Sequence, residues 1–192
     1  THRPDSFVDI LQRLAQQQPD QLAFAQLNAA TDIDQLLTYE QLARRATTIG
    51  QQLCAADLQG KPVLLLYPPG VEFVAALFGC FAAHAVAVPA IPPDPLRFEQ
   101  SLERLRHIVT DCACSHVLST TTLAQLAQPL LETHPDLAPL QWLRTDDPTV
   151  GFADSVSSSA AIPFPAECAL LQYTSGSTGR PKGTMLSQAN LL

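Results

Sequence analysis

Short apolar runs alternate along this chain with longer stretches of helical pattern, and this alternation most constrains its fold. Strands are expected at residues 22–27, 61–67, 86–88, 116–119, 140–143, 167–173 and 184–186. Helices are expected at residues 7–18, 38–56, 71–83, 98–112 and 122–132. Because strands joined by crossover helices lie parallel, the pattern predicts an α/β fold with a mostly parallel sheet flanked by helices.

Two predicted helices begin with the spacing of a capping box, a hydroxyl residue followed three positions later by an acidic or amide residue. Ser6 precedes Asp9 in the first, and Thr38 precedes Gln41 in the second. The helix at 98–112 has one apolar stripe, which is formed by Phe98, Leu102, Leu105, Val109 and Cys112. Such a stripe predicts a surface helix with one face packed on a sheet.

Residues 73–93 carry no formal charge and are long enough to cross a bilayer. His84 interrupts the run, however, and Pro89, Pro92 and Pro93 break its second half. The helical part is apolar nearly all round, as expected for a helix covered on both sides. We therefore predict a core helix between two strands and no membrane span.

Composition and charge exclude several classes of function. The chain of 192 residues is 46% hydrophobic and 15% charged, which is typical of a soluble globular protein. Its 18 acidic residues outnumber its 11 Lys and Arg residues, giving a net charge of −7. An acidic chain without a basic cluster is not expected to bind nucleic acid or an anionic membrane surface.

The five cysteines are an odd number without a Cys-x-x-Cys pair, which indicates reduced thiols and a cytoplasmic location. Cys112, Cys114 and His116 alternate, so on a strand all three would share one face. A metal site there is conceivable, but the ligand spacing of tetrahedral zinc sites is missing. The favoured interpretation is a group of small buried residues around the start of a strand.

The segment Tyr173-Thr-Ser-Gly-Ser-Thr-Gly-Arg-Pro-Lys-Gly183 lies between two predicted strands. It offers many backbone N–H groups, several hydroxyls and the mobile cation of Lys182, which are the groups that hold a polyphosphate. In an open parallel sheet, ligands bind beyond the carboxyl ends of strands, and this segment directly follows one. The alternative is a flexible surface turn that binds nothing.

Two common phosphate-binding motifs do not fit this segment. A Walker A motif requires Gly-Lys-[Ser/Thr] opening a helix, whereas Lys182 is preceded by Pro181 and followed by Gly183. The residues that follow, Thr184 to Leu186, favour a strand. The Rossmann spacing Gly-x-Gly-x-x-Gly is also absent. A P-loop kinase or GTPase is therefore excluded.

The segment instead resembles the signature of the adenylate-forming superfamily, which contains acyl-CoA synthetases, luciferases and the adenylation domains of peptide synthetases. Within it, the chain is most similar to the fatty acyl-AMP ligases. The stretches that carry this likeness are Leu64–Gly70, Phe78-Gly-Cys80, Val86–Pro93, Arg104–Asp111, Trp142–Asp146 and Leu171–Thr174. The resemblance implies that residues 1–192 form the first part of the large N-terminal AMP-binding domain, an incomplete layered αβαβα arrangement.

The resemblance also implies a two-step reaction. A fatty-acid carboxylate attacks the α-phosphate of ATP and releases pyrophosphate, and the acyl group then passes to the phosphopantetheine thiol of an acyl carrier protein. Lys182 is the expected catalytic cation. The expected nucleotide-binding residues are Thr174, Ser175, Gly176, Ser177, Thr178, Gly179 and Lys182. Acyl-CoA synthetase, peptide-synthetase adenylation domain and a non-enzymatic docking module stay open as alternatives.

The chain departs from the family pattern at two positions, of which Thr184, where Val is common, is the minor one. The family usually has His after the Ser or Thr that follows the loop, whereas this chain has Gln188 after Ser187. Gln cannot carry a charge, so the acyl preference is affected more than catalysis. The Mg²⁺ ligand and the C-terminal domain with its catalytic lysine are expected beyond Leu192. Residues 1–192 alone are therefore not expected to catalyse the reaction.

Overall fold

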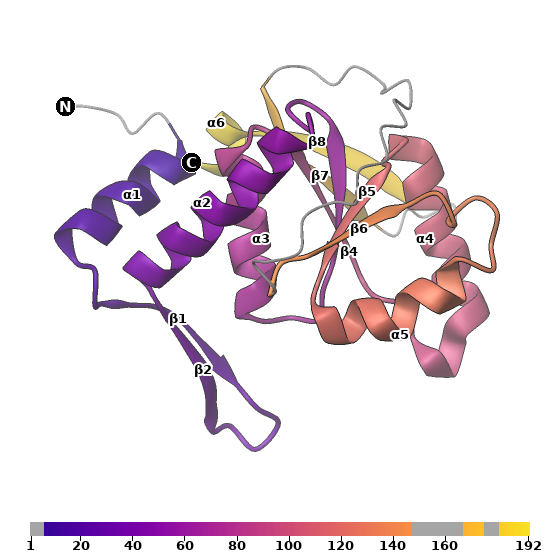
Figure 1. Ribbon diagram of the computed structural model, residues 1–192, viewed down its shortest axis with the longest axis horizontal. Coiled ribbons are helices and arrows are strands. Elements are labelled where there is room, and N and C mark those ends of the chain that lie inside the picture. Colours follow the sequence, from indigo (N-terminus) through magenta and orange to yellow (C-terminus); the bar gives the residue numbers. More distant parts are fainter. Residues whose placement is uncertain (1–5, 147–166, 175–180) are drawn as a thin grey trace.

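The computed structural model describes residues 6–146, 167–174 and 181–192, and it has the α/β fold that the alternation predicts (Figure 1). The helices are α1 (Phe7–Gln17), α2 (Tyr39–Ala55), α3 (Val71–Ala82), α4 (Phe98–Cys112), α5 (Thr121–Leu131) and the single turn α6 (Gln188–Leu191), with a 3-10 turn, η1, at Pro95–Arg97. The strands are β1 (Leu22–Leu27), β2 (Ile33–Thr38), β3 (Pro62–Leu66), β4 (Val86–Ala90), β5 (His116–Ser119), β6 (Gln141–Arg144), β7 (Cys168–Thr174) and β8 (Lys182–Ser187).

The main sheet has six strands in the order β6-β5-β3-β4-β7-β8. Its first five strands pair in parallel, and β8 pairs antiparallel with β7 at the edge. The carboxyl ends of β3, β4 and β7 therefore all lie at the same end of the sheet, its carboxyl edge. In open α/β sheets this edge carries the ligand site.

The sheet separates two hydrophobic cores. All five residues of β3 are buried, and they alternate between the cores, with Val63 and Leu65 on one side and Leu64 and Leu66 on the other. Helices α1, α2 and α3 cover the first side, and α4 and α5 cover the second (Figure 1). This burial on both faces explains why the central strands are continuous apolar runs.

Helix α3 is the core helix that the uncharged run predicts, because it is packed between the sheet and α2. The two helices approach closely at Gly79, where an added Cβ would lie 2.5 Å from Cγ2 of Ile49. No helix among the described residues is long and apolar enough to cross a membrane.

The predicted helices and strands are confirmed with ends that differ by a few residues, and the Thr38–Gln41 capping box is confirmed. At Ser6 only half of the box forms: the hydroxyl accepts from the Asp9 N–H, and the Asp9 carboxylate bonds that hydroxyl instead of the Ser6 N–H. The predicted loop after Asp146 lies almost wholly outside the described residues.

Strand β2 was absent from the prediction, since Ile33–Thr38 shows no regular alternation and only Leu37 is buried. It pairs antiparallel with β1 and forms a hairpin outside the main sheet (Figure 1). The side chain of Asn28 closes the turn, because its Oδ1 accepts from the N–H groups of Ala30 at 2.9 Å and Asp32 at 3.0 Å. Such local side-chain hydrogen bonds are typical of Asn in turns.

The supposed strand face of Cys112, Cys114 and His116 does not exist. Cys112 ends α4, Ala113 has a left-handed φ of 52°, and His116 begins β5. The left-handed residue reverses the chain at the helix end, so the three residues do not alternate on one strand. Cys112, Cys114 and His116 are buried, as the favoured interpretation expected.

Candidate functional site

The β7–β8 hairpin frames the glycine-, serine- and threonine-rich segment. Tyr173 pairs with Gly183 and Thr174 pairs with Lys182, so Thr174 and Lys182 face one another at the connecting end of the hairpin, where residues 175–180 join the two strands. Both Thr174 and Lys182 are exposed. The hairpin thus presents a hydroxyl and an ammonium group side by side, at the carboxyl edge of the sheet where the sequence predicts a ligand site.

Of the predicted nucleotide-binding residues, the structure describes Thr174 and Lys182. The other five, Ser175, Gly176, Ser177, Thr178 and Gly179, lie outside the described residues. Among the described residues, none of the ion pairs involves Lys182. Its charge therefore has no acidic partner there and is available for an anionic ligand.

Tyr173 packs across the hairpin onto Gly183. A Cβ at Gly183 would lie 3.1 Å from Cζ of the Tyr173 ring and 3.0 Å from Cδ1 of Leu171. Those distances are tighter than ordinary van der Waals contact. The absence of a side chain at Gly183 therefore leaves room for the buried ring beside the backbone that follows Lys182.

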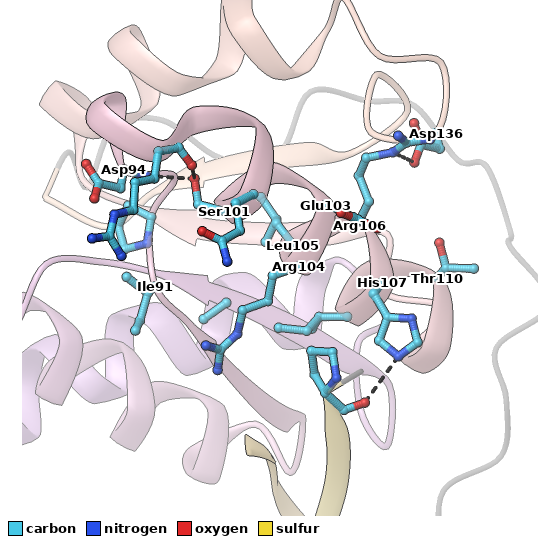
Figure 2. Close-up of a pocket in the computed structure, with 16 residues that line it drawn as sticks. Ile91, Asp94, Ser101, Glu103, Arg104, Leu105, Arg106, His107, Thr110 and Asp136 are labelled. Carbon is cyan, nitrogen blue, oxygen red and sulfur yellow. Dashed lines mark hydrogen bonds and ion pairs between the residues drawn. The ribbon is translucent and has the colours of Figure 1, made fainter. Parts of the chain in front are cut away.

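Helix α4 makes two hydrogen bonds to this hairpin. The Tyr173 hydroxyl donates to Oδ2 of Asp111 at 2.5 Å, and Nε2 of His107 donates to the carbonyl oxygen of Pro181 at 3.1 Å (Figure 2). Burial raises the pKa of Tyr173, and its hydrogen bond to the Asp111 carboxylate raises it further, so the hydroxyl stays a proton donor. The sequence singled out neither His107 nor Asp111 as a site residue. Two signals were available: both residues lie in Arg104–Asp111, one of the stretches that carry the family resemblance, and they are four positions apart on a helix whose apolar stripe excludes them.

An open groove of about 930 Å³ lies along α4 beside the hairpin (Figure 2). The end of β4 and Pro181 also line it. Its charges are mixed, with Arg97 and Arg104 among Asp94 and Glu103. Because of this mixture the groove has no single sign of charge, and Lys182 remains the described cation best placed for a phosphate.

The described residues fit a phosphate ligand better than a metal ion. Thr174 and Lys182 supply a hydroxyl and a cation, which suit phosphate oxygens. Among residues 6–146, 167–174 and 181–192, no group of three or more His, Cys, Asp or Glu side chains could hold a metal ion. No metal-dependent step is therefore assigned to this part of the chain.

Gln188, which stands where the family resemblance expects His, lies at the start of α6. Its side-chain oxygen accepts a hydrogen bond from the backbone N–H of Phe7 at 3.3 Å. This contact joins the beginning of α1 to the end of β8, and α6 lies near the start of α1 in Figure 1. In the described residues Gln188 therefore connects two distant parts of the chain.

Comparison with known proteins identifies related chains. Residues 11–192 match the family described as AMP-binding enzyme. The chain is 34% identical over 193 residues to the medium-chain-fatty-acid–[acyl-carrier-protein] ligase JamA of Moorena producens (strain JHB), covering 97% of this chain and 31% of that protein. It is 35% identical over 156 residues to a feruloyl-CoA synthase of Amycolatopsis sp, covering 81% of this chain and 29% of that protein.

Among solved structures, the chain is similar to the fatty acyl-adenylate ligase of L. pneumophila in complex with acyl adenylate and pyrophosphate. The TM-score is 0.74 and the identity is 30%, with 97% of this chain and 31% of that chain covered. The chain thus spans less than a third of the length of these relatives.

Proposed function

The chain belongs to the AMP-binding enzyme family, and from that premise we propose that it is the N-terminal part of the adenylation domain of a longer fatty acid–AMP ligase. The proposed protein activates a fatty acid with ATP, releases pyrophosphate and passes the acyl group to a carrier-protein thiol. The rest of the adenylation domain and the small C-terminal domain would follow Leu192.

One observation carries the proposal. Thr174 pairs with Lys182 at the connecting end of the β7–β8 hairpin, and these two residues flank the glycine-, serine- and threonine-rich part of the adenylate-forming signature. A cation and a hydroxyl at this edge of a parallel sheet suit the triphosphate of ATP. The fatty-acid ligases among the relatives, which match 97% of the chain, support the choice of substrate.

The proposed chemistry assigns a role to each of these groups. A carboxylate oxygen of the fatty acid bonds to the α-phosphorus, and the bond from that phosphorus to the bridging oxygen breaks, so that pyrophosphate leaves with the electron pair. Lys182 offsets the charge that develops on the leaving pyrophosphate. The hydroxyl of Thr174 and the groups of Ser175, Gly176, Ser177, Thr178 and Gly179 hold the phosphates in line for the displacement.

Mg²⁺ would neutralise further phosphate charge in this reaction. We propose that its acidic ligand lies beyond Leu192. We also propose a cytoplasmic location, which is supported by the absence of disulfides among the five cysteines, all of them described.

The acceptor of the acyl group has two candidates. The similarity to a fatty-acid–[acyl-carrier-protein] ligase favours a phosphopantetheine thiol on a carrier protein. The similarity to a feruloyl-CoA synthase favours coenzyme A instead, and aromatic acids as an alternative substrate class. We propose the carrier protein, because the match to the acyl-carrier-protein ligase covers more of the chain.

The test is pyrophosphate release by the complete protein with ATP, Mg²⁺ and one acid at a time. Medium- and long-chain fatty acids are expected to support release. Release with amino acids alone would indicate a peptide-synthetase adenylation domain, and release with aromatic acids alone would indicate an aryl-activating enzyme. No release with any acid would favour the non-enzymatic docking module.

Adding a phosphopantetheinylated carrier protein and coenzyme A in separate reactions distinguishes the acceptors. We expect loss of acyl-adenylate and gain of an acyl thioester with the carrier protein. An acyl thioester formed only with coenzyme A would assign the protein to the acyl-CoA synthetases.

A further inference from the structure

Helix α4 contacts the β7–β8 hairpin on both sides of its connecting end, where residues 175–180 join the two strands. On the β7 side, Asp111 accepts a hydrogen bond from the hydroxyl of Tyr173, and on the β8 side His107 donates one to the carbonyl of Pro181. Each contacted residue directly precedes one of the two exposed groups of the candidate site, Thr174 and Lys182. The helix therefore holds the hairpin at the two positions nearest to those groups.

The spacing on α4 makes this double contact possible. His107 and Asp111 are four residues apart, about one helical turn, so both project from the same side of the helix. In Figure 2 the imidazole of His107 points from α4 toward the carbonyl oxygen of Pro181. A single helix thus contacts both strands at the connecting end of the hairpin.

Helix α4 is well suited to act as a fixed support. Four of its residues near His107 and Asp111 are buried in the hydrophobic core on the α4 side of the sheet, namely Leu105, Ile108, Val109 and Cys112. The hairpin has less support of its own at the same place, because β8 is at the edge of the described sheet and pairs with β7 alone. Pro181 has no N–H group, so its carbonyl is its one backbone polar group.

We propose that His107 and Asp111 are positioning residues for the nucleotide site, fixing through Pro181 and Tyr173 the separation and direction of Lys182 and Thr174. This inference rests on the proposed function, since it concerns how those two groups meet the phosphates of ATP. Catalysis by charge and alignment is sensitive to displacements of about 1 Å, so loss of either hydrogen bond affects the reaction although neither side chain touches the ligand.

The test uses the complete protein and compares the Michaelis constants for ATP and for the fatty acid. His107→Leu removes the donor to Pro181 and keeps much of the side-chain volume. We expect kcat/KM for ATP to fall about tenfold, as for loss of one positioning hydrogen bond, with the KM for the fatty acid unchanged. His107→Gln is the conservative variant, because its amide N–H reaches the place of Nε2, and it should restore most of the loss.

Asp111 offers the same comparison on the other strand. Asp111→Ala removes the acceptor for the Tyr173 hydroxyl and should lower kcat/KM for ATP in the same direction. Asp111→Asn keeps an acceptor oxygen and should retain most of the activity.

Arg106→Gln is the matched control on the same helix. It breaks the ion pair of Arg106 with Asp136 at 2.5 Å, which attaches α4 to another loop and not to the hairpin. We expect this variant to keep the wild-type KM for ATP. A melting temperature lowered equally in Arg106→Gln and His107→Leu, with no difference in kcat/KM for ATP, would overturn the proposal.

Amide hydrogen exchange without ATP separates failure of this inference from failure of the proposed function. Exchange at residues 173–174 and 182–184 should be faster in His107→Leu than in Arg106→Gln. Equal exchange in both variants overturns the support by α4, whatever the activity. Faster exchange in a protein that activates no acid would retain the support by α4 and reject the adenylation function.

Discussion

The two antiparallel hairpins of this molecule are held in different ways. The β1–β2 hairpin projects from the body of the molecule outside the main sheet (Figure 1). Except for the buried Leu37, its large apolar side chains are exposed, namely Leu22, Phe24, Leu27, Ile33 and Leu36. The β7–β8 hairpin instead extends the main sheet, and β7 buries Cys168, Ala169, Leu171 and Tyr173.

The difference shows which interactions shape each hairpin. The turn of β1–β2 is closed locally by the side chain of Asn28, and Oε1 of Gln26 accepts a hydrogen bond from the N–H of Val71 at 3.1 Å to attach the hairpin to α3. The connecting end of β7–β8 is held by two residues of α4, Asp111 and His107, which lie 62 positions from Tyr173 and 74 positions from Pro181. The first hairpin thus depends on its own turn, and the second on the helix packed beside it.

The largest expected effect is at the connecting end of β7–β8. Lys182→Ala should lower pyrophosphate release by the complete protein on the order of a hundredfold. The variant lacks the preorganised positive charge that offsets the negative charge of the leaving pyrophosphate. Its melting temperature should barely change, since an exposed side chain without an ion pair among the described residues adds little to stability.

Lys61→Ala is the control for that variant, because Lys61 is the only other lysine of the sequence and pairs with Asp57 at the surface. It should leave pyrophosphate release unchanged. If Lys182→Ala lowered stability as much as activity, its role in holding phosphate would be contradicted.

The second effect compares one leucine from each hairpin. Leu171→Ala should cost about 2–5 kcal/mol of unfolding free energy, because Leu171 is buried in the core beneath β7. Leu36→Ala should change it by less than about 0.5 kcal/mol, because Leu36 is 53% exposed. Denaturant unfolding of the complete protein measures both. A cost at Leu36 close to that at Leu171 would mean that other parts of the protein cover β1–β2.

The third effect concerns the attachment of β1 to α3. A Cβ at Gly70 would collide with Oε1 of Gln26, which accepts from the N–H of Val71. Gly70→Ala and Gln26→Ala should each cost about 1 kcal/mol, the usual contribution of one hydrogen bond. Because both remove the same contact, the double variant should cost little more than either alone. Full additivity in denaturant unfolding would show that the two residues act independently.

The smallest effect is a pH dependence of the main sheet that β1–β2 does not share. Burial lowers the pKa of His116 on β5, and the nearby charge of Lys61 also lowers it. The unfolded chain takes up a proton near pH 6.5, whereas folded His116 resists it until lower pH. The free energy of unfolding should therefore decrease as the pH falls below about 6.5. It should stop decreasing once the pH is below the pKa of folded His116.

His116→Asn should remove this part of the pH dependence, as measured by unfolding at several pH values between 7 and 5. Comparison with wild type at each pH cancels the contribution of the carboxylates. An unchanged slope in the variant would assign the acid sensitivity to other groups.

Much of the fold could be predicted from the sequence because its signals are local. Capping at Thr38, the apolar stripe of α4 and the uniformly apolar run of β3 each determine one element from its own residues. Strand β2 could not be predicted, because only Leu37 of its six residues is buried, which leaves no alternation of apolar and polar residues. Its strand conformation depends on its antiparallel pairing with β1. The geometry of Cys112 and His116 depended on a left-handed residue between them that no pattern indicates.

The sequence by itself determined the α/β class, the place of the proposed phosphate-binding segment and the choice of Thr174 and Lys182 as candidate site residues, since short-range periodicity and a contiguous motif encode them. Only the tertiary structure decided that Thr174 faces Lys182 and that β8 turns back along β7. It also decided that one face of α4 reaches both sides of the hairpin through His107 and Asp111. The reason is physical: the register of β7–β8 is set by pairing between two strands, and the α4 contacts join residues 62 and 74 positions apart, which meet only when α4 and β7 pack in the same core.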